Sequence, residues 1–266
     1  MKLLLVSDLH YALKQFDWTA SVAPGFDAVI IAGDHLDIAG QLDGGVQIVV
    51  ILKYLRRLAA LSKVIVSSGN HDLDRRDAGG EKIASWMSKV RQLGIPTDGD
   101  SVAFGDTLVT VCPWWDGPTA RDSVHELLAR DAAKPRKQWI WVYHAPPEGP
   151  LSWDGKKHHG DAALNAWIET HRPDIVLTGH IHQAPFKQGG SWCDRMGDTW
   201  IFNSGRQIGP TPTHVAIDTR AREAAWFSLA GAELVKLDDA LVARTELTGP
   251  PAWLGASAEK REAALG

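Results

Sequence analysis

Cysteines, long apolar runs and excess positive charge are all scarce in this sequence, and each shortage excludes a class of protein. The two cysteines, Cys112 and Cys193, stand in no CxxC or CxxH pattern, so we interpret both as reduced thiols and exclude a disulfide scaffold. No stretch approaches the roughly 20 apolar residues that a membrane-spanning helix needs. The short apolar run of residues 1–6 lacks a following small-residue cleavage site, which favours a buried strand over a signal peptide. We therefore expect a cytoplasmic protein without a membrane partner.

The charge balance is slightly acidic, because 28 Lys and Arg residues stand against 32 Asp and Glu residues, for a net charge of −4. Broad binding to duplex nucleic acid requires a basic surface, so this balance argues against nucleic acid as the main partner. A local patch that binds a phosphate group is still compatible with it. The 266 residues, 44% of them hydrophobic, suffice for a sizeable core in one large α/β domain or two small ones.

Strand-like and helix-like segments alternate in the first half of the chain. Apolar runs predict strands at residues 2–7, 26–32 and 63–67, whereas residues 47–61 and 81–93 have helical periodicity. Such alternation predicts a mostly parallel sheet.

The second half adds more strands than helices. Gly105-Asp106, between the strand-like residues 101–104 and 107–112, is typical of a β-hairpin. Further elements are expected as strands at 138–143 and 174–178 and helices at 122–130 and 162–170. Short connections join the last three strands, which we expect to be antiparallel: residues 199–203, 214–218 and 224–228. Together these elements predict one domain, residues 1–243, and a C-terminal tail, residues 244–266, that is either docked or poorly ordered.

Carboxylate, amide and imidazole side chains follow five of the predicted strands, where ligands bind in open α/β sheets. These residues are Asp8, His10, Asp34, Asn70, His144, His180 and His182. The spacing of two in each of the pairs Asp8/His10 and His180/His182 points both side chains the same way in an extended chain. Any one of these residues alone is a common turn or core residue, but together they predict a metal site. Oxygen and nitrogen ligands without thiolate suit manganese, iron, zinc or similar divalent or trivalent ions.

Five sequence blocks in this order resemble the calcineurin-like metallophosphoesterases: DxH at residues 8–10, GDxxD at 33–37, GNHD at 69–72, His144 and GHxH at 179–182. The resemblance implies an α/β fold, a four-layer α/β/β/α sandwich with two mixed β-sheets flanked by helices. It also implies two metal ions. Asp8, His10 and His182 would hold the first ion, Asn70, His144 and His180 the second, and Asp34 would bridge them.

The resemblance further implies how such a site cleaves a phosphate ester. A hydroxide held between two metal ions attacks phosphorus, and a general acid protonates the leaving oxygen. His71 has the family position of that acid, with Asp37 as its expected orienting partner and Asp72 as the second choice. The alternative is that His71 only forms hydrogen bonds.

Aromatic and basic residues near these blocks are candidates for substrate binding. Trp114, Trp115 and Trp153 could stack a base, and Arg75 could contact a phosphate group. Core packing and a solvated loop are equally good interpretations of these four residues.

The sequence therefore predicts a metal-dependent phosphoric ester hydrolase that cleaves phosphodiesters or phosphomonoesters of a small, nucleotide-like substrate. A nuclease of the same superfamily is the alternative within that class, and the acidic charge balance argues against it. A non-catalytic scaffold that binds a protein partner is the alternative from another class, and the complete set of seven ligand residues argues against it.

Overall fold

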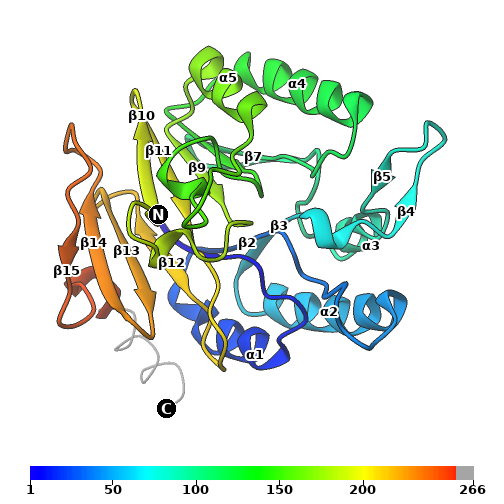
Figure 1. The fold of residues 1–266 in the computed structure, drawn as a ribbon, viewed down its shortest axis with the longest axis horizontal. Coiled ribbons are helices and arrows are strands. Elements are labelled where there is room, and N and C mark those ends of the chain that lie inside the picture. The colour runs from blue at the N-terminus through cyan, green and yellow to red at the C-terminus, as the bar shows by residue number, and fades with distance from the viewer. Residues whose placement is uncertain (256–266) are drawn as a thin grey trace.

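Two β-sheets lie face to face in the computed structural model, which describes residues 1–255, and helices cover the outer side of each sheet (Figure 1). The first sheet has seven strands in the order β15-β14-β13-β12-β1-β2-β3. Their bounds are β1 (Lys2–Val6), β2 (Ala28–Ala32), β3 (Lys63–Ser67), β12 (His214–Asp218), β13 (Glu223–Ser228), β14 (Gly231–Lys236) and β15 (Thr245–Glu246). Strands β1, β2 and β3 are mutually parallel, as the alternating pattern predicted, and β12 pairs antiparallel with both β1 and β13.

The second sheet has six strands in the order β10-β11-β9-β8-β7-β6. Their bounds are β6 (Ser101–Phe104), β7 (Thr107–Val111), β8 (Gln138–Val142), β9 (Ile175–Thr178), β10 (Cys193–Met196) and β11 (Thr199–Asn203). The predicted hairpin is confirmed as β6 and β7. The antiparallel prediction holds only in part for residues 199–203. Strand β11 pairs antiparallel with β10 but parallel with β9, and the chain then crosses to β12 in the first sheet, so residues 199–203 do not pair with residues 214–218.

The central strands of each sheet are buried on both faces, which explains why they are continuously apolar. Successive side chains of a strand point to opposite faces. Leu3 and Leu5 of β1 accordingly pack between the two sheets, where they meet Val109 and Ile140 of the second sheet. Leu4 of the same strand packs under the helices instead. The result is the four-layer α/β/β/α sandwich that the sequence predicted.

Five α-helices and four short 3₁₀ segments lie within residues 1–251. The helices are α1 (Leu13–Val22), α2 (Gly44–Ala59), α3 (Met87–Gln92), α4 (Pro118–Ala132) and α5 (Ala162–His171), and the 3₁₀ segments are η1 (Ala23–Gly25), η2 (Asn70–Asp72), η3 (Pro150–Ser152) and η4 (Ala184–Phe186). Helices α1, α2 and α3 cover the first sheet, and α4 and α5 cover the second. Helix α1 was not predicted from the sequence, because no capping side chain marks its start.

The helix predicted at residues 81–93 is wrong over its first half. Residues 75–83 form a small hairpin of β4 (Arg75–Arg76) and β5 (Lys82–Ile83), and α3 begins only at Met87. The Asp74 carboxylate accepts hydrogen bonds from both the backbone N–H and the hydroxyl of Ser85, at 2.6 and 2.7 Å. Side-chain acceptors of this kind compete with helical hydrogen bonds, so local polar contacts override the apolar periodicity here.

Part of the predicted tail is attached to the first sheet. Strand β15 pairs with β14, and the indole of Trp253 donates a hydrogen bond to Glu223 at 2.8 Å. Lys2 Nζ also donates to the Trp253 carbonyl oxygen, at 2.5 Å. The last residues of the predicted tail, 256–266, lie outside the described residues. Among residues 1–255, no helix is both long and apolar enough to cross a membrane.

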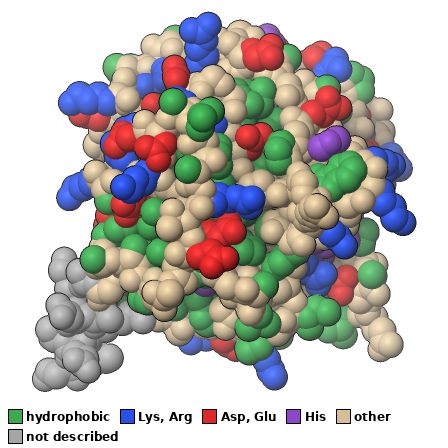
Figure 2. Space-filling model, turned by 60° about the vertical axis from the view of Figure 1, so that its left-hand side comes forward, with side chains coloured by type: hydrophobic (Ala, Val, Ile, Leu, Met, Phe, Trp, Pro, Cys, Tyr) green, Lys and Arg blue, Asp and Glu red, His purple; other side chains and the backbone are tan. Residues whose placement is uncertain are grey.

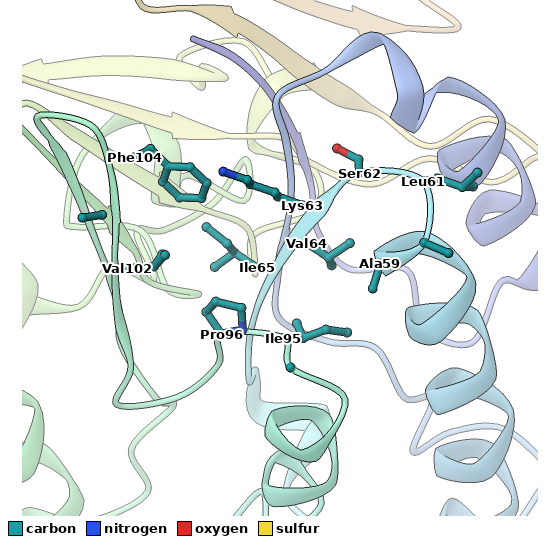
Figure 3. A pocket seen from close by; sticks show the side chains of 13 residues that line it. Ala59, Leu61, Ser62, Lys63, Val64, Ile65, Ile95, Pro96, Val102 and Phe104 are labelled. Atoms are coloured by element: carbon teal, nitrogen blue, oxygen red, sulfur yellow. The ribbon is translucent and has the colours of Figure 1, made fainter. Parts of the chain in front are cut away.

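An apolar groove lies between the outer edges of β3 and β6 (Figure 3). Val64, Ile95 and Val102 line it, and the Lys63 ammonium group lies 4.6 Å from the centre of the Phe104 ring. Lys63 is the first residue of β3, so the groove opens beside the amino end of that strand, away from the polar side chains that follow its carboxyl end.

A buried carboxylate joins α4 to the second sheet. Asp131 is fully buried, and it accepts hydrogen bonds from the hydroxyl groups of Thr110 and Ser101, at 2.7 and 2.5 Å, and pairs with Lys134 at 2.6 Å. Burial alone would raise the pKa of Asp131, but these partners outweigh it and lower the pKa below the ordinary value of 3.8. Because folding favours the ionised carboxylate, its stabilising effect is present above about pH 4 and is lost as the pH falls.

We expect Asp131→Ala to lower the free energy of unfolding at pH 7 by about 3 kcal/mol, because it leaves buried hydroxyl groups and a cation without their acceptor. Urea denaturation measures this change. Asp131→Asn is the matched control: it keeps an oxygen acceptor and should lose less. The difference in the free energy of unfolding between wild type and Asp131→Ala should become smaller below about pH 4, where the wild-type carboxyl becomes protonated. Equal stability of wild type and Asp131→Ala at pH 7 would contradict the stabilising role.

Candidate metal centre

The seven predicted ligand residues all follow the carboxyl ends of parallel strands. Asp8 and His10 follow β1, Asp34 follows β2 and Asn70 follows β3, so four of them come from the first sheet. His144 follows β8, and His180 and His182 follow β9, so three come from the second sheet. Backbone hydrogen bonds hold neighbouring loops together: Asp8 N–H donates to Gly33 O at 3.1 Å, and Gly179 N–H donates to His144 O at 2.8 Å. We call these seven residues the ligand cluster.

The backbone of these loops is not extended, contrary to the geometry we expected for the pairs with a spacing of two. Asp8, His10, Asp34 and His180 all have positive φ angles, of 54°, 40°, 55° and 69°. Non-glycine residues seldom adopt this left-handed conformation, and when they do they concentrate at functional sites. Four of the seven such residues between positions 1 and 255 belong to the ligand cluster. Tight left-handed turns, and not an extended chain, therefore bring the side chains together.

One group of ligand atoms comes from Asp8, His10, Asp34 and His182, whose potential ligand atoms all lie within 4.8 Å of one another. His182 Nε2 lies 3.2 Å from Asp8 Oδ1 and 3.1 Å from His10 Nε2. His10 Nε2 lies 3.6 Å from Asp34 Oδ2. Two carboxylates and two imidazoles therefore converge on a space of the size that one metal ion needs.

A second group of ligand atoms comes from Asp34, His144 and His180 and meets the same distance limit of 4.8 Å. His144 Nε2 lies 3.3 Å from Asp34 Oδ2. The other ring nitrogen of His144, Nδ1, donates a hydrogen bond to the Ala32 carbonyl oxygen at 2.6 Å. That bond fixes the tautomer and leaves Nε2 as the ligand atom, as second partners of metal-bound histidines commonly do. Asp34 belongs to both groups.

Two buried polar atoms of the cluster support a fit to metal ions. Asn70 Oδ1 and His144 Nε2 are buried without a hydrogen-bond partner among residues 1–255. Buried polar atoms are almost always paired, so unpaired ones call for an explanation such as a bound ion. Gly69 leaves the room for this arrangement, since a Cβ atom there would lie 2.2 Å from Asp34 Oδ1. The donor set of carboxylate, amide and imidazole groups also suits divalent transition metals.

Burial and mutual charge interactions shift the pKa values within the ligand cluster. Burial lowers the pKa of both His10 and His180 to about 4, so both imidazoles are neutral at pH 7 and offer lone pairs. Burial also disfavours charge on His144, but the negative charge of Asp34 outweighs it and raises the pKa of His144 to about 9, so a cation bound at Nε2 would take the place of the proton there. For Asp34, burial would raise the pKa, yet His144 and a hydrogen bond from the His71 backbone hold it well below 3.8.

His71 lies at the rim of the ligand cluster. Its backbone N–H donates to Asp34 Oδ1 at 2.8 Å, and its Nε2 lies 4.0 Å from Asp34 Oδ2. A nitrogen of His71 and an oxygen of Asp37 meet the 4.8 Å limit in a third group with His10. Asp72 lies elsewhere: its carboxylate is fully buried and binds His35 Nδ1 at 3.0 Å and the Gly69 N–H at 2.8 Å. The structure thus places Asp37, and not Asp72, near the His71 ring.

Only one of the four expected substrate contacts lies against the ligand cluster. The Trp114 ring is 5.6 Å from the His144 ring and 5.2 Å from the His180 ring, measured between centroids. The Trp115 indole instead donates to the Tyr143 hydroxyl at 2.6 Å. Trp153 donates to the Gln188 carbonyl oxygen at 3.0 Å, and Arg75 is exposed on the β4–β5 hairpin.

One basic residue beside the ligand cluster, Arg206, was not predicted from the sequence. It follows β11, whose carboxyl end lies beside that of β9, and its N–H donates to the His182 carbonyl oxygen at 3.0 Å. The strand itself was predicted at residues 199–203. The polar run Asn203-Ser204-Gly205-Arg206 directly after it is the signal that could have found this residue, by the strand-end rule that found the other seven.

Comparisons with known proteins agree with the fold. A family model described as calcineurin-like phosphoesterase matches residues 1–184. The solved structure of TT1561 from Thermus thermophilus is similar with a TM-score of 0.57 at 15% identity, over 92% of this chain and 98% of that one. The purple acid phosphatase PPD1 from yellow lupin (Lupinus luteus) seeds is similar with a TM-score of 0.53 at 13% identity, over 91% of this chain and 52% of that one. At such identities the structures show a shared fold alone, and the chain has no significant match among curated proteins.

Proposed function

Because this chain belongs to the calcineurin-like phosphoesterase family, we propose that it hydrolyses phosphate esters with the help of two metal ions in the ligand cluster. The observation that carries the proposal is Asp34, which belongs to both groups of ligand atoms. Asp8, His10 and His182 would hold one ion, Asn70, His144 and His180 the other, and Asp34 would contact both. The second ion would have only Asp34, His144 and His180 as ligands without Asn70. The Asn70 Oδ1 atom, which is buried without a hydrogen-bond partner, supports its role as the fourth ligand.

Bound at these residues, divalent cations would supply the activation of a water molecule at neutral pH and the neutralisation of charge on phosphate oxygens. The chain's own residues do the rest. Asp34 and Asp8 are buried and stay ionised, which favours cations there. His71, at the rim, would hold the proton that the leaving oxygen needs. Asp37, whose carboxylate lies within 4.8 Å of a His71 ring nitrogen, would orient that ring.

The proposed substrate is a small phosphodiester or phosphomonoester with a nucleotide-like group. Trp114 supports this proposal, because its ring lies against two histidines of the ligand cluster and could stack on a base. A cytoplasmic location remains part of the proposal; Cys112 and Cys193 are both free and buried.

Two measurements on the purified protein test the proposed function. Elemental analysis counts the bound metal ions, and turnover is followed with bis-p-nitrophenyl phosphate and with p-nitrophenyl phosphate. Two ions per chain and turnover of either ester would support a phosphoesterase, and the faster of the two esters assigns it as a diesterase or a monoesterase. Absence of metal and of turnover after incubation with Mn²⁺ would support the protein-binding scaffold instead.

The nuclease alternative requires a broad basic surface for the nucleic acid backbone. On the face shown in Figure 2, Lys and Arg side chains are dispersed among Asp and Glu side chains. This distribution and the net charge of −4 favour a small substrate over a long polyanion.

A further inference from the structure

Arg206 lies on the segment of residues 204–213 that carries the chain from the second sheet to the first. Its backbone N–H donates to the carbonyl oxygen of the predicted ligand His182 at 3.0 Å. Its side chain is half-buried, and its guanidinium group forms no hydrogen bond or ion pair with any side chain or backbone group of residues 1–255. A guanidinium group presents five N–H donors in a rigid fork, so this residue has unused capacity to bind an anion.

The start of this segment is fixed in place by buried hydrogen bonds. The Asn203 side chain donates to Leu151 O at 3.0 Å and Ile181 O at 3.1 Å, and accepts from the Gly205 N–H at 2.8 Å. Gly205 has a φ of +70°, and a Cβ atom there would lie 2.7 Å from Pro185 Cγ and 3.1 Å from His182 O. The chain can therefore pass this closely beside the His180–His182 turn only because residue 205 is glycine.

The other side of the segment is anchored to the first sheet and to α1. The Ser204 hydroxyl lies 2.7 Å from the Ser7 hydroxyl, next to the ligand Asp8. Gln15 Nε2 donates to Gln207 O at 2.9 Å, on the residue after Arg206. Residues on both sides of Arg206 are thus held by partners outside the segment, so the position of its backbone is set before any ligand binds. Such preorganisation reduces the entropy lost on binding.

The hydrogen bond from the Arg206 N–H to the His182 carbonyl oxygen places Arg206 beside the ligand cluster. The nearest acids of the cluster, Asp8 and Asp34, are buried and engaged with histidines, and neither pairs with Arg206. An anion held at the cluster would therefore be the missing partner of Arg206.

We propose that Arg206 binds a non-bridging oxygen of the substrate phosphate, as a binding residue that adds to the proposed metal ions. This inference rests on the proposed function, since it takes the phosphate group to lie at the ligand cluster. Guanidinium groups match phosphate in shape and charge, and their hydrogen bonds to it are about twice as strong as neutral ones. A phosphomonoester carries more negative charge than a diester, so Arg206 favours a monoester or orthophosphate over a diester.

Calorimetric titration of the Mn²⁺-loaded protein with inorganic phosphate tests this role without relying on turnover. Arg206→Gln should raise the dissociation constant for phosphate at least about tenfold, since hydrogen bonds to charged groups contribute roughly 1.5–3 kcal/mol. The dissociation constant of Arg206→Lys should lie between those of the wild type and Arg206→Gln, because lysine keeps the positive charge but lacks the forked N–H donors of the guanidinium group. Metal content should match that of the wild type. With p-nitrophenyl phosphate, KM should rise more than kcat falls.

Arg220→Gln is the matched control, because it removes the same charge from an exposed turn beyond the far end of β12. Wild-type phosphate affinity in Arg206→Gln, with metal bound, would overturn the role of Arg206 and leave the proposed function standing. An equal loss of phosphate affinity in Arg206→Gln and Arg220→Gln would also overturn the role of Arg206, since it would reflect the change in net charge alone. Absence of phosphate binding by the Mn²⁺-loaded wild type would also overturn the role of Arg206, whereas the proposed function is decided separately by metal content and turnover.

Discussion

Replacement of Asp34 by asparagine should remove most of the metal from both positions together and lower turnover by at least about 100-fold, which corresponds to about 3 kcal/mol. Asp34 is the one residue that belongs to both groups of ligand atoms, and its Oδ2 lies 3.3 Å from His144 Nε2 and 3.6 Å from His10 Nε2. Asparagine has the same shape but no charge. It can still accept the hydrogen bond from the His71 N–H, so the loop after β3 should keep its conformation.

Elemental analysis of the Asp34→Asn protein, after dialysis against buffer of defined Mn²⁺ concentration, measures the loss. Asp106→Asn is the matched control, because Asp106 is an exposed partner of Lys137 in the β6–β7 turn, at the opposite end of β7 from the cluster. Loss of one ion with full retention of the other would show that Asp34 serves a single position. That result would contradict its proposed role in both.

The second large effect is expected at His71, where alanine should lower turnover of esters with poor leaving groups by roughly 10²–10⁴-fold, the usual contribution of a general acid. The same variant should retain most of its activity on p-nitrophenyl phosphate, because nitrophenolate leaves without a proton. His71 lies outside the two groups that contain Asp34, and its hydrogen bond to Asp34 comes from the backbone N–H, which alanine keeps, so the metal content should match that of the wild type.

A series of phenyl phosphates with leaving groups of increasing pKa separates this role from a structural one. For His71→Ala, the logarithm of kcat should fall more steeply with leaving-group pKa than for the wild type. An unchanged slope would show that His71 does not supply the proton. A loss of metal in the same protein would assign it to the ligands instead, and elemental analysis of each preparation detects that case.

The strand-end rule located the ligand cluster from sequence because burial and alternation are local properties. Consecutive apolar residues such as Leu3, Leu4 and Leu5 point to both faces of their strand, which identifies a strand buried between two layers. The first polar residues after such parallel strands then lie at the same edge of the sheet. What the rule could not supply was the backbone conformation of Asp8 and His10. Their positive φ angles depend on hydrogen bonds to Gly33 and Asp34, which are distant in sequence.

Local sequence patterns also could not predict which of the two sheets a strand joins. Residues 199–203 and 214–218 look alike as apolar strands with a short connection, yet β11 and β12 belong to different sheets. Contacts between residues far apart in the sequence accompany the passage of the chain from the second sheet to the first, such as the hydrogen bond between the hydroxyl groups of Ser204 and Ser7. Missing that crossing also meant missing Arg206, which lies on it.

The ligand cluster draws four residues from one sheet and three from the other, so any cation held there is also a clamp between the two halves of the sandwich. Folding and ion occupancy are then thermodynamically linked, and the free energy of unfolding rises with RT ln(1 + [L]/Kd), by about 2.7 kcal/mol at a hundredfold excess over Kd. If the ligand cluster binds a cation as proposed, scarcity of that ion would weaken the contact between the two sheets and lower activity, and the protein would then unfold more readily when metal is scarce.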